Sequence, residues 1–442
     1  MRCAFAILCA VKYGHSIWIS FLATLTAAAL PFSAIAQQQS FRDLTLKMDY
    51  TVTCPNQDEK AFPGITGEVT VQGLTLRVDL FKYLHSTEMT LALPRKPEAN
   101  ELQFRWDAST DCRLEHFEPT VESAVIEEAE SDDHYAALAM KHSPFLVVRK
   151  DQLTERQRDL PIGIAYSVMP TAKNTVKIRY TMFFSNETVH GLGSTSKSAS
   201  LARYGRRTDI EWIYDVEFDS QGSVISRHYQ SGIIRGLGHA TKRFKGRFLP
   251  GTEHPIFFDI AKHNVFGTRG SFDENGDPTR AGYHLVPREE LPSDGAREWW
   301  QWERPWVFDL NDRELRRGGG YFEAPSNDYL YVLVTGKMKK ARLWTHFSQE
   351  GFFLRGPKLG DLGEGLWGKQ SFLALKMSEA DQAKGGKISL LPVKTGIFFR
   401  HHGTMNLEPL RFFRLKADPE GGFTPEEVTQ DFHCDSNLEC KF

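Results

Sequence analysis

Acidic residues alternate with apolar ones along residues 209–218, Asp-Ile-Glu-Trp-Ile-Tyr-Asp-Val-Glu-Phe. Alternate side chains of a β-strand point to the same face, so this period predicts that the four acids share one solvent-facing side. They are Asp209, Glu211, Asp215 and Glu217. Residues two apart on a strand lie about 7 Å apart, and glycosidases hold two carboxyl groups about 5 to 9 Å apart. The segment predicts a carboxylate pair for glycosidic chemistry, with Glu211 the better catalytic candidate and Asp209 beside it.

Arginines stand just before the acidic segment, in Arg203-Tyr-Gly-Arg206-Arg207. If the acidic face is only solvated, these arginines form surface ion pairs with it. If the face binds a polysaccharide, Arg203 and Arg206 bind the substrate, and in a lyase an arginine stabilises the charge of a uronate. In that lyase Tyr204 or His190 removes the proton. Both interpretations remain open from the sequence.

The triplet Asp209-Ile-Glu211 is similar to part of the Glu-x-Asp-x-Glu signature of laminarinase-type jelly-roll glycosidases. The opening glutamate of that signature would fall at Arg207, and the closing glutamate is offset. Since only this part of the signature is present, no catalytic assignment is transferred from that family.

Tryptophans crowd residues 298–306, Glu-Trp-Trp-Gln-Trp-Glu-Arg-Pro-Trp. Flat aromatic faces beside polar groups stack on sugar rings, so Trp299, Trp300 and Trp302 are candidate substrate-binding residues. The competing interpretation is that most of them fill the core, because tryptophan is largely buried on average. As a strand, the segment would place Trp299 and Trp300 on opposite faces.

Nucleotide and metal motifs are incomplete. Residues 363–368 fit G-x-G-x-x-G, but Gln370 stands where a P-loop needs Ser or Thr to hold magnesium. Residues 273–284 begin with the spacing of a calcium loop, yet they end in His284 where that loop needs glutamate. The histidines match no metal-binding spacing. The sequence predicts no metal site and no cofactor.

Alternating or continuous apolar runs recur along the chain, separated by Gly, Pro, Asn and Asp. The clearest runs are 44–52, 69–80, 176–184, 210–218, 256–260, 329–334 and 397–400. Helical candidates are few, at 121–138 and 152–159, and both are charged and expected on the surface. The pattern predicts an all-β protein, an antiparallel β-sandwich of jelly-roll type with a few short surface helices.

The N-terminal segment has the pattern of a secretory signal peptide. Arg2 and Lys12 accompany an apolar run at 17–30, and Ala34-Ile-Ala36 is a small-x-small cleavage site. The run is too short for a membrane span and lacks a basic stop-transfer cluster, so no span is expected after cleavage. The mature protein is therefore expected in the periplasm or outside the cell.

An acidic stretch with helical pieces interrupts the strands between about residues 118 and 170. The segments expected are 1–36, the signal peptide; 37–165, an N-terminal β domain with an acidic helical linker; 166–415, a larger β-sandwich domain; and 416–442, a tail with a small disulfide loop. The alternative is one continuous sandwich, because strands of both halves could share a sheet.

Cysteines beyond residue 36 are even in number: Cys54, Cys112, Cys434 and Cys440. An even set in an exported protein predicts disulfides, because that compartment is oxidising. Of the possible connectivities, proximity in sequence favours Cys54 with Cys112 and Cys434 with Cys440.

The formal net charge of the chain is −2. Such a near-neutral balance argues against a general nucleic-acid binder, which needs a strongly basic face. Together these patterns predict a secreted β-rich protein that acts on a polysaccharide or glycan, as a hydrolase or a lyase. The alternative is a non-catalytic envelope or carbohydrate-binding protein whose tryptophans hold the glycan.

We expect the mature protein to begin at or near Gln37, because signal peptidase cleaves after small-x-small. Intact-mass measurement of protein from the envelope or medium should show the loss of residues 1–36. Cytoplasmic protein that retains Met1 would contradict the expected compartment.

Overall fold

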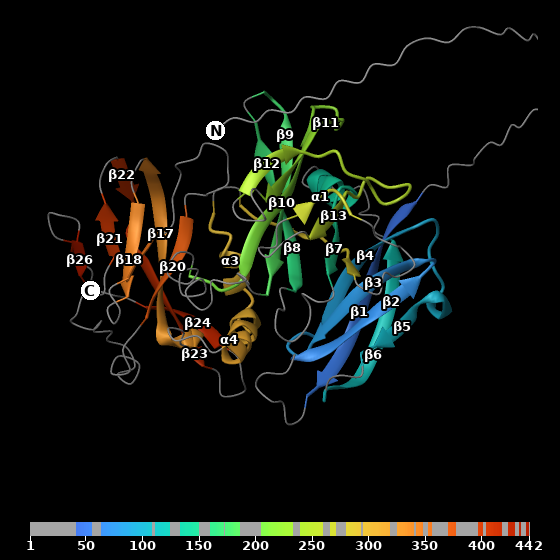
Figure 1. Cartoon of the computed structure of the whole chain (residues 1–442), viewed down its shortest axis with the longest axis horizontal. Helices are drawn as coiled ribbons and strands as arrows, with labels where there is room; N and C mark the ends of the chain where they lie inside the picture. The colour runs from blue at the N-terminus through green and yellow to red at the C-terminus, as the bar shows by residue number, and fades with distance from the viewer. Residues whose placement is uncertain are drawn as a thin grey trace, which may run out of the picture. The chain divides into compact units, whose positions relative to one another are not determined.

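The computed structural model describes residues 41–54, 63–107, 111–123, 133–149, 160–171, 173–185, 205–232, 239–259, 266–270, 280–292, 295–318, 325–339, 342–347, 352–355, 370–376, 397–400, 404–417, 423–428, 433–434 and 439–441. Antiparallel strands dominate these residues, with a few short helices (Figure 1). The predicted all-β class is thus confirmed.

The first six strands form two three-stranded antiparallel sheets, in the orders β4-β1-β6 and β3-β2-β5. Their bounds are β1 Arg42–Thr53, β2 Gly64–Val71, β3 Leu74–Phe81, β4 Ser86–Leu93, β5 Gln103–Trp106 and β6 Arg113–Ser123, with a 3-10 helix, η1, at Ala99–Glu101. Alternate side chains such as Leu46 of β1, Leu76 of β3 and Leu91 of β4 are buried in one shared core. Two sheets that bury their facing sides in this way form a β-sandwich.

A six-stranded sheet follows, in the order β12-β11-β10-β9-β8-β16. Its strands are β8 Pro161–Pro170, β9 Val176–Phe184, β10 Asp209–Phe218, β11 Val224–Gly232, β12 His239–Arg243 and β16 Glu289–Glu290. Nearly every residue of β9 and β10 is buried, so both faces of the sheet are covered at these strands. The register of β10 against β9 shifts between Trp212 and Tyr214, which marks a β-bulge.

Strand β7 (Phe145–Arg149) contributes to two cores at once. Phe145 and Val147 pack into the core of the N-terminal sandwich, whereas Leu146 and Val148 pack into the core of the six-stranded sheet. This division follows from the alternation of side chains along a strand. Helix α1 (Asp133–Lys141) precedes β7. Strand β7 lies in a four-stranded sheet with β13 (Ile256–Asp259), β14 (Phe266–Gly267) and β15 (Arg280–Tyr283), in the order β14-β13-β7-β15.

The C-terminal part begins with helices α3 (Trp299–Trp302) and α4 (Trp306–Gly318). One sheet has the order β20-β17-β23-β24 with β22 beside β17, and another has the order β19-β18-β21-β26-β25. The bounds are η4 Ser326–Asp328, β17 Tyr329–Lys339, β18 Arg342–Phe347, β19 Phe352–Arg355, β20 Gln370–Lys376, β21 Ile397–Arg400, β22 Thr404–Leu407, β23 Arg411–Ala417, β24 Phe423–Val428, β25 His433–Cys434 and β26 Glu439–Lys441. Trp302 packs with Tyr331, Phe372 and Phe413 in a separate aromatic core.

The helix expected at 121–138 is only partly correct. Residues 121–123 belong to β6, and the helix spans Asp133–Lys141. Of the charged residues in that range, Glu122 is exposed on β6, an edge strand that pairs with β1. The second candidate, 152–159, lies outside the described residues, and the expected domain boundaries stay predictions. In the described part of the chain, no helix combines the length and the apolar character that crossing a membrane requires.

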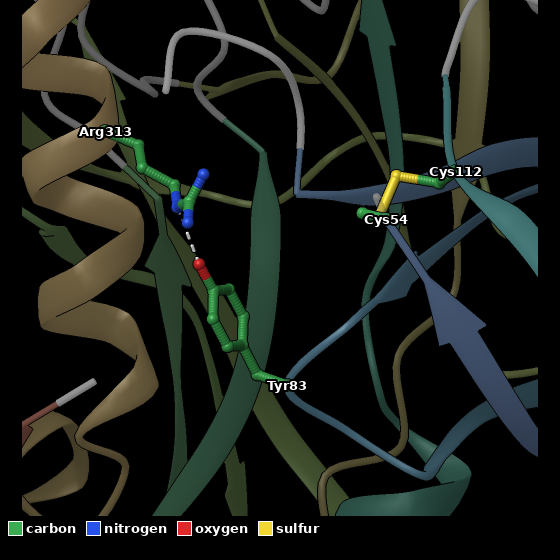
Figure 2. The surroundings of a disulfide bond; sticks show 4 residues. All are labelled: Cys54, Tyr83, Cys112 and Arg313. Carbon is green, nitrogen blue, oxygen red and sulfur yellow. Dashed lines mark hydrogen bonds between the residues drawn. A yellow bond between two sulfur atoms is a disulfide. The ribbon is translucent and has the colours of Figure 1, made fainter. Parts of the chain in front are cut away.

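The predicted bridge between Cys54 and Cys112 is confirmed, and it closes a separation of 58 residues between the end of β1 and the start of β6 (Figure 2). Cys434 and Cys440 are register partners on β25 and β26, and their bridge stays a prediction. Figure 2 also shows Tyr83, after β3, whose hydroxyl accepts a hydrogen bond of 2.7 Å from Arg313 of α4.

Replacing both Cys54 and Cys112 by serine should lower the free energy of unfolding by about 4 kcal/mol, because the bridge restricts the unfolded chain. Denaturant titration under oxidising conditions measures this loss. The same change at Cys434 and Cys440, whose predicted bridge would close a short loop, should cost about 2 kcal/mol. An unchanged midpoint after loss of the first bridge would contradict the expectation.

Candidate functional site

The acids of β10 fall into two groups. Asp209 and Asp215 are only 3% and 2% exposed, whereas Glu211 and Glu217 are half-buried. The expected solvent-facing acidic side is therefore wrong for the two aspartates. Strict alternation ends at the bulge, and β9 and β11 flank the strand on both sides.

Asp215 is held by a buried bidentate ion pair. Arg179 of β9 donates from Nε to Oδ1 at 2.7 Å and from Nη2 to Oδ2 at 2.8 Å, and its guanidinium lies 4.6 Å from the ring centroid of Trp212. Charge-assisted pairs of this geometry are strong, and removing one partner leaves a buried charge. Asp215 therefore neutralises Arg179 inside the sheet.

Glu217 is held differently. Its carboxylate accepts hydrogen bonds from Thr175 at 2.6 Å and from Ser226 at 2.9 Å. These hydrogen bonds lower the pKa of Glu217, so this half-buried acid stays ionised.

Arg206 and Arg207 do not form the expected surface ion pairs with their own segment, because both are buried. Arg207 lies 2.6 Å from Asp312 of α4, and Arg206 lies 3.4 Å from Glu298. Burial raises the pKa of Asp312, against the opposing charge of Arg207. Both arginines thus contact acids that are distant in sequence. Arg203, Tyr204 and His190 lie outside the described residues.

Glu211 retains access to solvent and contacts two neighbouring strands. Its side chain is 18% exposed, and its Oε1 lies 3.5 Å from Nε2 of His239, which is 45% exposed. Gln230 of β11 donates a hydrogen bond to its other oxygen. We call Glu211, Gln230 and His239 the Glu211 cluster. It joins β10, β11 and the edge strand β12.

A cation stands near this cluster. Burial lowers the pKa of the half-buried Arg297, while the charges of Glu298 and Glu211 act in the opposite direction. Both glutamates are therefore within electrostatic range of Arg297. An acid-base pair and a positive charge share this part of the protein.

The tryptophan segment forms a short helix instead of a strand, since the amide of Trp302 bonds to the carbonyl of Glu298 at 3.2 Å. Trp300 and Trp302 are 4% and 5% exposed. Trp300 stacks on Phe183, with centroids 4.0 Å apart. Trp299 is half-buried, and its Nε1 donates to Gln370 at 3.3 Å. The rings of Trp300 and Trp302 are therefore packed in the core, whereas Trp299 keeps some exposed surface.

Asp43, Ser143, His254 and His284 form a largely buried network that was not predicted from the sequence. His254 contacts Asp43 at 2.8 Å through Nε2 and the carbonyl of Ser143 at 3.0 Å through Nδ1. The hydroxyl of Ser143 lies 3.0 Å from Nε2 of His284. Ser143 and both histidines are 0% exposed, so in this Ser-His-Asp combination only the side chain of Asp43, which is 25% exposed, reaches solvent. Its members come from four separate parts of the sequence, and no spacing could have indicated them.

Two histidines stay neutral well into the acid range. Burial, together with the charges of Arg227 and Lys141, lowers the pKa of His142 to about 3. Burial also lowers the pKa of His284 well below its ordinary value, helped by the neighbouring His254. Folding therefore opposes protonation at both positions.

Metal and family signals add nothing further. No group of three or more His, Cys, Asp or Glu that could hold a metal ion occurs among the described residues. Comparisons with family models, with curated proteins and with solved structures found no match for this chain. Its own side chains are therefore the basis for assigning a function.

Acidification should destabilise the protein through His142. The unfolded side chain takes up its proton near pH 6.5 and the folded one near pH 3, so the unfolded state binds more protons between these values. Stability is complete above about pH 6.5 and falls by up to about 1.4 kcal/mol per unit below it. Urea unfolding of the wild type and of His142→Gln, from pH 7 to about pH 4, measures the slope.

The variant His142→Gln should show a shallower loss of stability with falling pH. His116→Gln is the matched control, because His116 is exposed on β6. Equal slopes for the wild type and His142→Gln would show that His142 does not contribute to acid sensitivity.

Proposed function

We propose that this chain is a carbohydrate-active protein that acts on a polysaccharide, with Glu211 and His239 as a proton-transfer pair. The observation that carries the proposal is their 3.5 Å contact at the accessible edge of the sheet. A general acid or base must come within hydrogen-bond reach of its substrate. The exposure of His239 meets this requirement, whereas the burial of Asp209 and Asp215 argues against those acids.

Of the two reaction types, this arrangement favours a lyase. Hydrolysis needs a second carboxyl group facing the same bond, and Asp215 is committed to Arg179. A lyase needs a base, an acid and a positive charge beside a uronate. The Glu211 cluster offers the base and the acid, and Arg297 offers a positive charge within electrostatic range of Glu211.

In the proposed reaction, His239 removes the proton from the carbon next to the uronate carboxylate. The electron pair of that C–H bond forms a carbon–carbon double bond, and the bond from the ring to the leaving oxygen breaks. The leaving oxygen takes up a proton from the imidazolium of His239 or from water, and the imidazole becomes neutral again by giving up its proton. Glu211 orients the imidazole and stabilises its charged form. Tyr204 and His190 stay alternative candidates for the base.

The other candidate is a non-catalytic protein that binds glycan through its tryptophans. Of the candidate rings Trp299, Trp300 and Trp302, Trp299 is the one with exposed surface, so it is the favoured contact in this case. The secreted or periplasmic location is also part of the proposal. The signal-like N-terminus and the Cys54–Cys112 bridge support it.

Glu211→Gln should lower turnover on a polysaccharide by at least about 100-fold, because it removes the charge that supports His239 and general acid-base catalysis typically contributes this much. The substitution preserves the shape of the side chain, so the thermal midpoint should change little. Turnover on a panel of acidic and neutral polysaccharides measures the effect. Glu217→Gln is the matched control on the same strand and should retain the wild-type rate.

An unchanged rate in Glu211→Gln would remove Glu211 from the mechanism. A large fall in thermal midpoint would make it a structural partner instead. Wild-type protein that binds glycan without cleaving it would support the binding candidate and contradict the catalytic one.

A further inference from the structure

The edge strand β12 and the irregular segment after it carry a concentration of positive charge. Lys242, Arg243, Lys245 and Arg247 are all exposed and lie within six residues. We call these four residues the basic edge. The whole chain has a net charge of −2, so this local excess of positive charge is opposite in sign to the net charge of the chain.

The backbone under the basic edge is anchored by an aromatic side chain. Phe244, between Arg243 and Lys245, is 8% exposed, with its ring centroid 5.7 Å from that of Tyr214 and 5.3 Å from that of Phe257. Its amide donates to the carbonyl of Arg227 at 2.9 Å. The cations are therefore presented from a fixed strand edge.

Neighbouring acids do not neutralise the basic edge. Glu253 belongs to the adjacent turn, and it pairs with Arg227 at 2.5 Å. In the described part of the chain, the ion pairs include none of Lys242, Arg243, Lys245 or Arg247. Lys242 instead donates to the hydroxyl of Ser231 at 3.1 Å, and Arg247 donates to the carbonyl of Gly270 at 2.9 Å. Their charge is available to an anionic ligand.

The basic edge continues directly from the Glu211 cluster. His239 and Arg243 are four positions apart on β12, opposite Gly232 and His228 of β11. Residues separated by an even number of positions share a face, and these two Cα atoms lie roughly 13 Å apart along the strand. A polymer with a sugar unit at His239 therefore has neighbouring units within reach of Arg243.

We propose that the substrate is an acidic polysaccharide, whose carboxylate or sulfate groups bind the basic edge while one sugar unit occupies the Glu211 cluster. This inference rests on the proposed function, and it adds the substrate class and the residues that select it. Exposed cations attract a polyanion through its charge and leave neutral glycans without that attraction.

The test compares binding of the full chain to polygalacturonate, to a sulfated glucan and to an uncharged β-glucan. Charge reversal in Arg243→Glu with Lys245→Glu should weaken binding to the acidic polymers by at least about tenfold, since two attractions become repulsions. The matched control is Lys96→Glu with Lys173→Glu, which makes the same charge change at exposed positions outside the strands and helices. Raising the salt concentration should weaken binding by the wild type.

A binding loss for the carboxylated polymer alone, or for the sulfated polymer alone, identifies which anionic group the basic edge selects. Equal affinity for the uncharged glucan, salt-independent binding, or an equal loss in the control would overturn the inference. Tighter binding of duplex DNA than of polygalacturonate would also overturn it, in favour of a nucleic-acid ligand. Cleavage separates the two proposals: intact acidic-polymer binding without cleavage contradicts the chemistry at Glu211 and leaves the basic edge supported.

Discussion

Asp215 and Arg179 form two hydrogen bonds inside the six-stranded sheet, at 2.7 and 2.8 Å. The sheet is buried on both faces at this point, and an unpaired charge there would be strongly destabilising. The same constraint applies at Arg207, which lies 2.6 Å from Asp312. Each of these buried ions has a partner from another strand or helix, and these partners determine which charged groups remain for chemistry.

Glu211 is the acid of β10 that combines exposed surface with a contact to a histidine. Its contact with His239 depends on the antiparallel order of β10, β11 and β12. Gln230 lies on the middle strand and donates to Glu211 from there. The candidate site is therefore a consequence of sheet register across three strands, and the cations of β12 extend it along the edge.

The sequence predicted the strand at 209–218 because apolar side chains recur there with a period of two. It also predicted the Cys54–Cys112 bridge, since these are consecutive cysteines, with no other cysteine between them in the sequence. The burial of Asp209 was not predictable, because it depends on flanking strands and on a bulge that local pattern does not indicate. The helix at Trp299–Trp302 was missed for a related reason: an aromatic run of this length fits either a strand or a buried helix. His239 was not selected because its proximity to Glu211 arises only when the sheet forms.

The proposal that Glu211 and His239 transfer protons is tested most directly by mass analysis of the products formed from polygalacturonate. Elimination leaves an unsaturated sugar at the new non-reducing end, whereas hydrolysis adds water across the cleaved bond. We expect unsaturated products from the wild type and at least about 100-fold slower formation of them by Glu211→Gln. Saturated products, or unsaturated products formed equally well by Glu211→Gln, would contradict the proposal.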